Sequence, residues 1–294
     1  MFVLLGSNGQ ITSQIAHRLL AGGHPVRVVG RNAGALASLQ QAGAQIAVGD
    51  PSDAAFLERA FAGATAVYTM TPPCYTEPSM RAAQDRIGEA VARALRGARV
   101  RRVVNLSSIG AELPSGTGPI VGLHAQEARL NAIDGLDLLH LRPGSFMENL
   151  LAAVPMVAAG EPLPGMEAPD VSIPMVATRD IAAVAARELT APQHQGVLVL
   201  HSPAHVTMRE AAAVLGAAIG NPGLPYVQAP PATMKAALQA EGLSADAADQ
   251  LEALARWLSS EPLASVASAP VAVQPTTFED FAREVFAPAC QTSR

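Results

Sequence analysis

Short apolar segments alternate with helical segments through the first half of this chain. The segments expected to form strands are residues 2–5, 26–29, 45–48, 66–70, 103–106 and 136–141. The helices expected between them cover residues 10–21, 33–42, 52–61, 78–96 and 123–133. Short apolar strands that are each followed by a helix are typical of a parallel sheet with helices on both faces. We therefore expect an α/β fold with a Rossmann-type, doubly wound parallel sheet.

The alternation weakens after residue 143, and the later residues read as mostly helical. The elements expected there are helices near 147–159, 179–189 and 207–220, a strand at 196–200 and a final helix from residue 276. This pattern predicts two units: a Rossmann domain made of 1–145 and 177–200, and a smaller, mostly helical substrate-binding lobe made of 146–176 and 201–294. A cleft between two such units is the expected ligand site.

A glycine turn joins the first expected strand to the first expected helix. Gly6 permits the tight turn, and Gly9 lets backbone N–H groups approach a pyrophosphate at the helix N-terminus. Similar turns occur by chance, and Thr12 stands where a third glycine would aid helix packing. The turn nevertheless lies directly after the first strand and opens a helix, as dinucleotide binding requires. We therefore expect a dinucleotide cofactor.

The residue after the second strand bears on which dinucleotide is bound. Arg31 follows Gly30 at the end of that strand. A cationic side chain here can contact a ribose 2′-phosphate, whereas an acidic one would bond a bare 2′-hydroxyl. A solvated surface arginine is the alternative interpretation. The position favours NADP(H), with NAD(H) as the less expected cofactor.

Other residues at strand ends are candidates for the same crevice. Asp50 could accept from the adenine amino group or cap the next helix, for which Ser52 is the expected N-cap. Pro72 and Pro73 could hold the chain open beside the cofactor, or could form a rigid loop without a further role. Ser108 follows the fifth strand, and His124 lies at the start of the next helix as a possible proton donor or as a structural histidine.

Composition narrows the class of partner. The net charge of −5 gives no basic stripe for nucleic acid, and the longest apolar stretch, 150–159, is too short for a membrane span. The N-terminus does not read as a signal peptide, and two distant cysteines favour a reducing cytoplasm. His201 and His205 have a metal-pair spacing, but Pro203 opposes the helix it needs, so no metal is expected. We expect a cytoplasmic protein that binds a small molecule, and a homodimer is one possible assembly.

Several motifs, in this order along the chain, resemble the NmrA-like family of atypical short-chain dehydrogenases/reductases, including its bacterial quinone, azo-dye and triphenylmethane reductases. The resemblance covers essentially the whole chain. The matching motifs are Gly6–Ile11, Gly30–Asn32, Gly49–Asp50, Val67–Pro73, Asn105–Ala111, Leu141–Leu150, the helix at 207–220 and the C-terminal segment Pro275–Phe281. The run Arg-Pro-Gly-x-Phe-Met-Glu-Asn within Leu141–Leu150 is fairly specific.

The resemblance implies a role for individual residues. Pyrophosphate contacts fall to Gly6, Ser7, Asn8, Gly9, Gln10 and Ile11. By the same resemblance, Arg31 contacts the 2′-phosphate and Asp50 lies near adenine. Thr71 and Pro72 lie near the nicotinamide ribose, and Pro143 and Phe146 lie near the nicotinamide.

The chain departs from standard short-chain dehydrogenases at their Tyr-x-x-x-Lys pair. Ile120 stands at the tyrosine position and His124 at the lysine position. Without the tyrosine the usual alcohol–ketone proton relay is absent. We therefore expect an NADPH-dependent reductase of conjugated, electron-poor acceptors (quinone, azo compound, iminium or enone), with His124 and Ser108 as catalytic residues. The alternatives are a non-catalytic NADP(H) sensor and a biosynthetic enzyme with non-redox chemistry.

Overall fold

The main sheet is parallel throughout and carries eight strands. The computed structural model describes residues 1–6, 9–260, 267 and 269–293. The strands are β1 (Phe2–Leu5), β2 (Val26–Gly30), β3 (Gln45–Val48), β4 (Ala66–Met70), β5 (Arg102–Leu106), β6 (Asp137–Pro143), β10 (Gly196–His201) and β12 (Val271–Val273). Their order is β12-β10-β6-β5-β4-β1-β2-β3. The inner part is the doubly wound 3-2-1-4-5-6 arrangement, which confirms the expected Rossmann-type fold.

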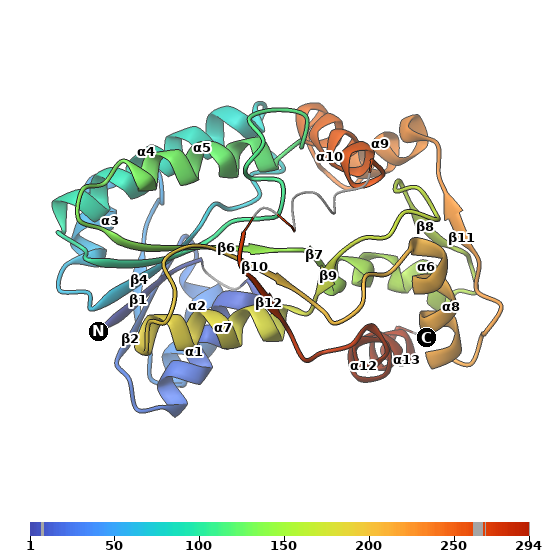
Figure 1. The fold of residues 1–294 in the computed structure, drawn as a ribbon, viewed down its shortest axis with the longest axis horizontal. Helices are drawn as coiled ribbons and strands as arrows, with labels where there is room; N and C mark the ends of the chain where they lie inside the picture. The colour runs from blue at the N-terminus through green and yellow to red at the C-terminus, as the bar shows by residue number, and fades with distance from the viewer. Residues whose placement is uncertain (7–8, 261–266, 268, 294) are drawn as a thin grey trace.

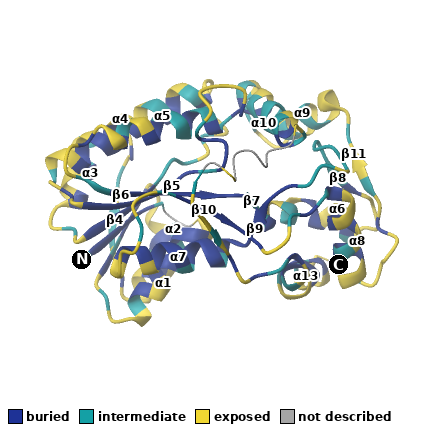
Figure 2. Ribbon diagram, viewed as in Figure 1, coloured by how far each residue is buried: buried dark blue, intermediate teal, exposed yellow. Residues whose placement is uncertain are grey.

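Helices cover both faces of this sheet (Figure 1). One face carries α1 (Gln10–Ala21), α2 (Ala33–Gln41) and α7 (Thr178–Thr190), and the other carries α3 (Ala54–Phe61), α4 (Met80–Gly97) and α5 (Ile120–Asn131). Successive strand residues point to opposite faces, so Phe2 and Leu4 enter one apolar core while Val3 and Leu5 enter the other. The inner strands are accordingly buried through most of their length (Figure 2), whereas the edge strands β3 and β12 are partly exposed. No helix in the described ranges is long and apolar enough to cross a membrane.

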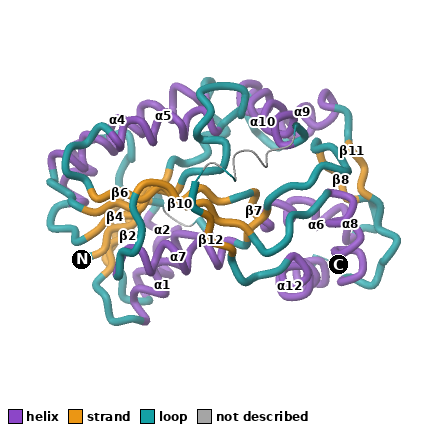
Figure 3. The backbone as a smooth tube through the Cα atoms, viewed as in Figure 1, coloured by secondary structure: helices purple, strands orange, loops and turns teal. Residues whose placement is uncertain are grey.

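The remaining elements form a mostly helical lobe beyond the carboxyl ends of the strands (Figure 3). They are β7 (Ser145–Phe146), η1 (Met147–Ala153), α6 (Val154–Ala158), β8 (Leu163–Gly165), β9 (Met175–Val176), α8 (Met208–Ala218), β11 (Tyr226–Gln228), α9 (Pro231–Ala240), α10 (Ala245–Leu258), α12 (Phe278–Phe281), η2 (Ala282–Phe286) and α13 (Ala287–Thr292). This lobe has an apolar core of its own, built around Met147, Leu215 and Phe281.

Three expectations differ from the structure. The helix at 52–61 was expected to have Ser52 as its N-cap, which is wrong: α3 begins at Ala54, and the Asp53 side chain accepts from the N–H groups of its first turn. The single helix expected at 147–159 is instead a 3₁₀ segment followed by the short α6, with Pro155 in the first turn of α6. Strand β12 returns from the C-terminal region to pair with β10, so it crosses the proposed division into two units.

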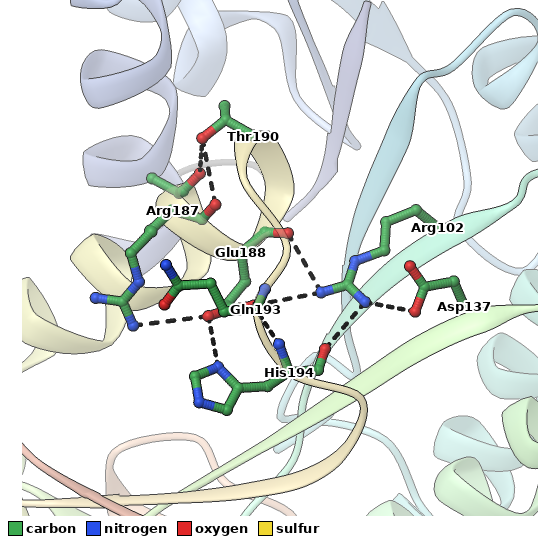
Figure 4. Close-up of polar contacts among 8 residues, drawn as sticks. Arg102, Asp137, Arg187, Glu188, Thr190, Gln193 and His194 are labelled. Carbon is green, nitrogen blue, oxygen red and sulfur yellow. Dashed lines mark hydrogen bonds and ion pairs between the residues drawn. The ribbon is translucent and has the colours of Figure 1, made fainter.

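A buried arginine joins the elements at the amino ends of the strands, away from the lobe. The Arg102 guanidinium donates to Asp137 Oδ1 at 2.7 Å and to the Glu188 carbonyl at 3.3 Å (Figure 4). Glu188 in turn accepts from the backbone and ring of His194. The network ties the end of α7 to the first residues of β5 and β6, at the end of the strands opposite the lobe.

Candidate active site

Gly6 stands where the sheet order reverses, between β1 and β4. Its φ is +126°, which an L side chain rarely adopts. A Cβ on Gly6 would also lie 2.7 Å from Thr12 Oγ1 and 3.3 Å from Met70 Cγ. The protein itself therefore requires glycine at this position, because the turn that starts α1 passes tightly against β4.

Gly9 has a different reason to be glycine. It is the N-cap of α1, with an ordinary φ of −60°, and a Cβ there would meet no protein atom within 4 Å. No side chain of the described residues caps α1, whereas Asn32, Asp53 and Ser79 cap α2, α3 and α4. The N–H groups at the start of α1 are therefore not used by a capping side chain of the described residues, which fits a bound pyrophosphate.

A groove of about 220 Å³ runs from this helix start along the ends of the strands. The residues that line it are Gly9, Gln10, Ile11, Thr12, Tyr68, Met70, Leu106, Phe146, Glu148, Asn149 and Thr178. It brings together four of the expected cofactor residues, Gly9, Gln10, Ile11 and Phe146. The residues expected at Ser7 and Asn8 lie outside the described part of the chain.

The carboxylate of Glu148 faces this groove but has its own partner. It accepts from the backbone N–H of Thr178 at 3.0 Å and from its hydroxyl at 2.7 Å. Thr178 is the first residue of α7, so Glu148 stabilises the positive end of that helix. Its negative charge is thereby compensated beside a groove suited to an anionic ligand.

Arg31 lies exposed after β2, where loops that follow β3 and β4 also arrive. A hydrogen bond from the Ser52 backbone lowers the pKa of Asp50, and the charge of Arg31 adds to this effect. Burial raises the pKa of Cys74, and the charge of Arg31 opposes this. The observed side-chain contact of Asp50 is with the backbone N–H of Ser52, in the turn before α3, while its expected contact with adenine stays a prediction.

A second, larger cavity of about 330 Å³ adjoins the groove and shares Met70, Leu106, Phe146 and Asn149 with it. Its further lining residues are Thr71, Pro73, Tyr75, Met80, Gln84, Ser107, Ser108, Ile109, Pro119, Ile120, Leu123, Gly144, Ser145, Leu254, Trp257 and Leu258. Most of this surface is apolar, with aromatic rings from three separate segments. Of the expected site residues, Thr71, Ser108 and Phe146 line the cavity.

The two expected proline contacts lie beside these residues. Pro72 is half-buried between Thr71 and Pro73, both of which line the cavity. Pro143 is buried at the end of β6, directly before the segment from Gly144 to Phe146 that lines the cavity. Neither proline lines the cavity itself, but the residues next to each do. Their expected positions near the nicotinamide ribose and ring stay predictions.

Helix α10 supplies one wall of the cavity through Trp257. Gly110 has a φ of +84°, and a Cβ there would lie 2.7 Å from the indole ring. Gly118 has a φ of +59°, and a Cβ there would overlap the Gln250 carbonyl. Both glycines therefore let α10 pack directly on the loop after β5. The local sequence of an amphipathic helix carries no signal for this placement, and sequence reasoning missed Trp257 as well as Tyr75.

His124 lies beside the cavity rather than in its wall. Its Nδ1 is 2.8 Å from the Ala111 carbonyl oxygen. Because a carbonyl oxygen only accepts, Nδ1 carries a proton, and the other nitrogen donates only in the imidazolium form. Ile120 and Leu123, from the same helix, line the cavity instead. Ile120, at the position of the family tyrosine, thus presents an apolar side chain to the site.

A buried ionic network supports the floor of the cavity. Arg142 donates to Glu127 through Nε at 2.9 Å and through Nη2 at 2.6 Å, and Ser107 Oγ donates to Glu127 Oε1 at 2.5 Å. Burial alone would raise the pKa of Glu127, but the hydrogen bonds and charge of Arg142 and the Ser107 bond hold it below its usual value. Glu127 is therefore an ionised acceptor. Sequence reasoning noted Arg142 within a motif but missed Glu127.

Comparison with known proteins identifies relatives along most of the chain. Residues 6–192 match the family described as NAD(P)H-binding. A (4-alkanoyl-5-oxo-2,5-dihydrofuran-3-yl)methyl phosphate reductase from Streptomyces griseus is 30% identical over 76% of this chain and 75% of its own. An NAD(P)H azoreductase from Xenophilus azovorans is 30% identical over 87% of each chain.

Solved structures share the fold. An NADPH-dependent quinone oxidoreductase from Escherichia coli, solved with NADPH, superposes with a TM-score of 0.77 at 24% identity, over 97% of this chain and 100% of its own. The triphenylmethane reductase of Citrobacter sp., solved with NADP(H), has a TM-score of 0.75 at 18% identity, over 100% of each chain. The likeness to these structures confirms the expected fold. The match to the NAD(P)H-binding family and the two reductase relatives confirm the resemblance at the level of the family.

Proposed function

The chain belongs to the NAD(P)H-binding family, and from this premise we propose that it is an NADPH-dependent reductase of conjugated, electron-poor small molecules. The cofactor, when bound, supplies the hydride. The residues proposed to hold it are Gly6, Ser7, Asn8, Gly9, Gln10, Ile11, Arg31, Asp50, Thr71, Pro72, Pro143 and Phe146. The open helix start at Gly9 fits a pyrophosphate, and the exposed Arg31 fits a 2′-phosphate.

One observation carries the proposal. The groove at the start of α1 and the apolar cavity share Met70, Leu106, Phe146 and Asn149, so one wall belongs to both. A small molecule in the cavity would therefore lie next to whatever occupies the groove, which is the arrangement that direct transfer between two bound molecules needs. Phe146 is the proposed packing wall between them.

The character of the cavity supports flat, conjugated substrates. Its aromatic residues Tyr75, Phe146 and Trp257 offer ring faces, and most of its surface is apolar. Two of the relatives are named as an azoreductase and as a reductase of an alkanoyl-substituted oxo-dihydrofuran phosphate. The substrates that these names describe are both conjugated acceptors. We propose a quinone, azo compound, iminium or enone as the substrate, because such acceptors spread the incoming charge over their π-system.

Two residues are proposed to assist the reaction. Ser108 lines the cavity, and its hydroxyl has no partner among the described residues, so it can donate to a substrate heteroatom. His124 is proposed to orient the cofactor ribose or to supply a proton. Its bond to Ala111 fixes the ring beside the cavity, so removal of His124 tests whether that position matters for turnover.

The cavity also weighs against a non-catalytic sensor. A sensor needs only the dinucleotide groove, whereas this chain keeps a second, apolar space of about 330 Å³ next to it. Non-redox chemistry on a bound small molecule is the other alternative, and it would leave the dinucleotide unchanged during turnover.

The test is a titration of the purified protein with NADPH and NADH, read by nicotinamide fluorescence, followed by assays of NADPH oxidation with quinones, azo dyes and enones. We expect NADPH to bind more tightly than NADH, and NADPH to be oxidised only when an acceptor is present. If NADPH binds but no acceptor in these classes supports its oxidation, the reductase proposal fails and the sensor is favoured. His124→Ala with unchanged cofactor affinity and turnover would remove the role of that residue.

A further inference from the structure

The single hydroxyl proton of Ser107 is already committed within the protein. Ser107 Oγ lies 2.5 Å from Glu127 Oε1, and the Arg142 guanidinium holds both oxygens of that carboxylate. A carboxylate paired in this way only accepts hydrogen bonds, so the hydroxyl must be the donor. All three side chains are buried, and burial strengthens the hydrogen bond between Ser107 and Glu127.

Ser107 also lines the cavity, next to Ser108. Having donated its proton to Glu127, its oxygen retains lone pairs and no hydrogen to offer. Donation to a carboxylate also polarises the hydroxyl and makes its oxygen a better acceptor. The adjacent hydroxyls therefore differ in what they offer to a molecule in the cavity. Ser108 can donate a hydrogen bond to it or accept one from it, whereas Ser107 can only accept.

We propose that Ser107 is a specificity-determining residue that accepts a hydrogen bond from the substrate, so that the preferred substrates are conjugated acceptors with an N–H or O–H group adjacent to a carbonyl. This inference rests on the proposed reductase function, which supplies the reaction. Ser108 donates to the carbonyl of such a substrate, and Ser107 accepts from its neighbouring N–H or O–H. Glu127 is a positioning residue, because it acts only through Ser107.

A matched pair of quinones tests the proposal. 2-(Methylamino)-1,4-naphthoquinone offers one N–H next to a carbonyl, and 2-(dimethylamino)-1,4-naphthoquinone replaces that hydrogen with a methyl group. A third probe, 2-methoxy-1,4-naphthoquinone, lacks the N–H without the bulk of a second N-methyl group. One hydrogen bond of ordinary strength corresponds to a preference of about tenfold for the N–H compound.

Binding can be read separately from turnover, because Trp257 is the only tryptophan of the chain and it lines the cavity. Quenching of its fluorescence by each quinone, with NADP⁺ present so that no reduction occurs, gives the three affinities. The ratio of kcat/KM for NADPH oxidation then gives the same preference during reaction. We expect the N–H compound to be favoured about tenfold in both measurements.

Variants identify the source of the preference. Ser107→Ala removes the acceptor but leaves the Glu127–Arg142 pair intact, so the protein should fold and bind the N–H and dimethylamino compounds equally. The matched control is Ser108→Ala, which should weaken the binding of both compounds and leave the ratio of their affinities unchanged. Glu127→Gln presents an amide group to Ser107 that can donate, which would release the serine proton and reverse or abolish the preference.

The outcomes separate this inference from the function on which it rests. Equal affinities in the wild-type protein, or a preference that persists in Ser107→Ala, would overturn the role of Ser107 even if every quinone is reduced. A preference in tryptophan quenching that Ser107→Ala abolishes supports it, even if NADPH is not oxidised and the reductase proposal fails. Absence of quenching by all three quinones would overturn it as well.

Discussion

Asp246, on α10, accepts a hydrogen bond from the backbone N–H of Met80, the first residue of α4, at 2.8 Å. The neighbouring Ser244 N–H donates to the Tyr75 carbonyl at 2.9 Å. These two contacts fasten the lobe to the segment after β4. Because Met80, Tyr75 and Trp257 all line the cavity, the same contacts hold its walls in place.

Asp246→Ala should therefore lower stability and widen the cavity together. Loss of an acceptor at a helix N-terminus costs about 1 kcal/mol of the free energy of unfolding. The measurement is urea denaturation, combined with the KM for the best acceptor, which should rise because α10 is less firmly held. Asp246→Asn is the control, since an amide oxygen can still accept from Met80. Equal losses in both variants would mean that charge, and not this hydrogen bond, is responsible.

The two glycines of the first turn should respond differently to alanine. Gly9→Ala should lower the unfolding midpoint less than Gly6→Ala, because the φ of Gly9 is ordinary and no protein atom is near. It should reduce NADPH affinity about tenfold by filling the pyrophosphate position. Gly6→Ala should instead lower stability by about 1 to 3 kcal/mol, because of its φ of +126° and the crowding by Thr12. Thermal unfolding and a nicotinamide fluorescence titration measure the two effects. Normal NADPH binding by Gly9→Ala would remove the glycine turn from the proposed cofactor site.

Arg31 should distinguish the two dinucleotides. Arg31→Ala is expected to weaken NADPH binding by about tenfold, the size of one charge-assisted hydrogen bond at an exposed site. NADH affinity should be nearly unchanged. Titrations at low and high salt measure this, since the loss should shrink as salt screens the charge. Arg31→Lys, which keeps the charge without the planar fork, should fall between the two. Equal losses for NADPH and NADH would show that Arg31 does not contact the 2′-phosphate.

Most of the sheet was predictable from sequence, because the apolar strands at 2–5, 26–29 and 103–106 are each followed by a clear helix signal. Strand β12 was not, since Val271 and Val273 are exposed and three residues give no alternating pattern. For the site, strand-end residues such as Ser108 were predictable from the order of the strands. Trp257 and Glu127 were not, because their roles depend on how distant elements pack.

The buried His140 gives a prediction for the pH dependence of stability. Burial lowers the pKa of His140 from 6.5 to about 4, with the charge of Arg142 acting in the same direction and Glu127 against it. Its neutral ring bonds Asn105 through Nδ1 and Asn131 through Nε2, each at 3.1 Å. Between pH 6.5 and pH 4 the unfolded chain therefore binds a proton at this residue that the folded chain does not. The contribution of His140 is fully present above pH 6.5 and is lost as the pH falls towards 4, by about 3 kcal/mol in all.

His140→Gln should remove this part of the pH dependence, because a glutamine amide can donate and accept in place of the ring but does not titrate. We expect the variant to lose about 3 kcal/mol less than the wild-type protein between pH 6.5 and pH 4, measured by urea unfolding at several pH values. His17→Gln, at an exposed position on α1, is the matched control and should follow the wild type. Carboxylates remote from His140 act equally in all three proteins, so the difference between the curves reports on His140 and on its coupling to Glu127. Parallel curves for His140→Gln and the wild type would mean that the ring gains its proton in the folded state as readily as in the unfolded chain.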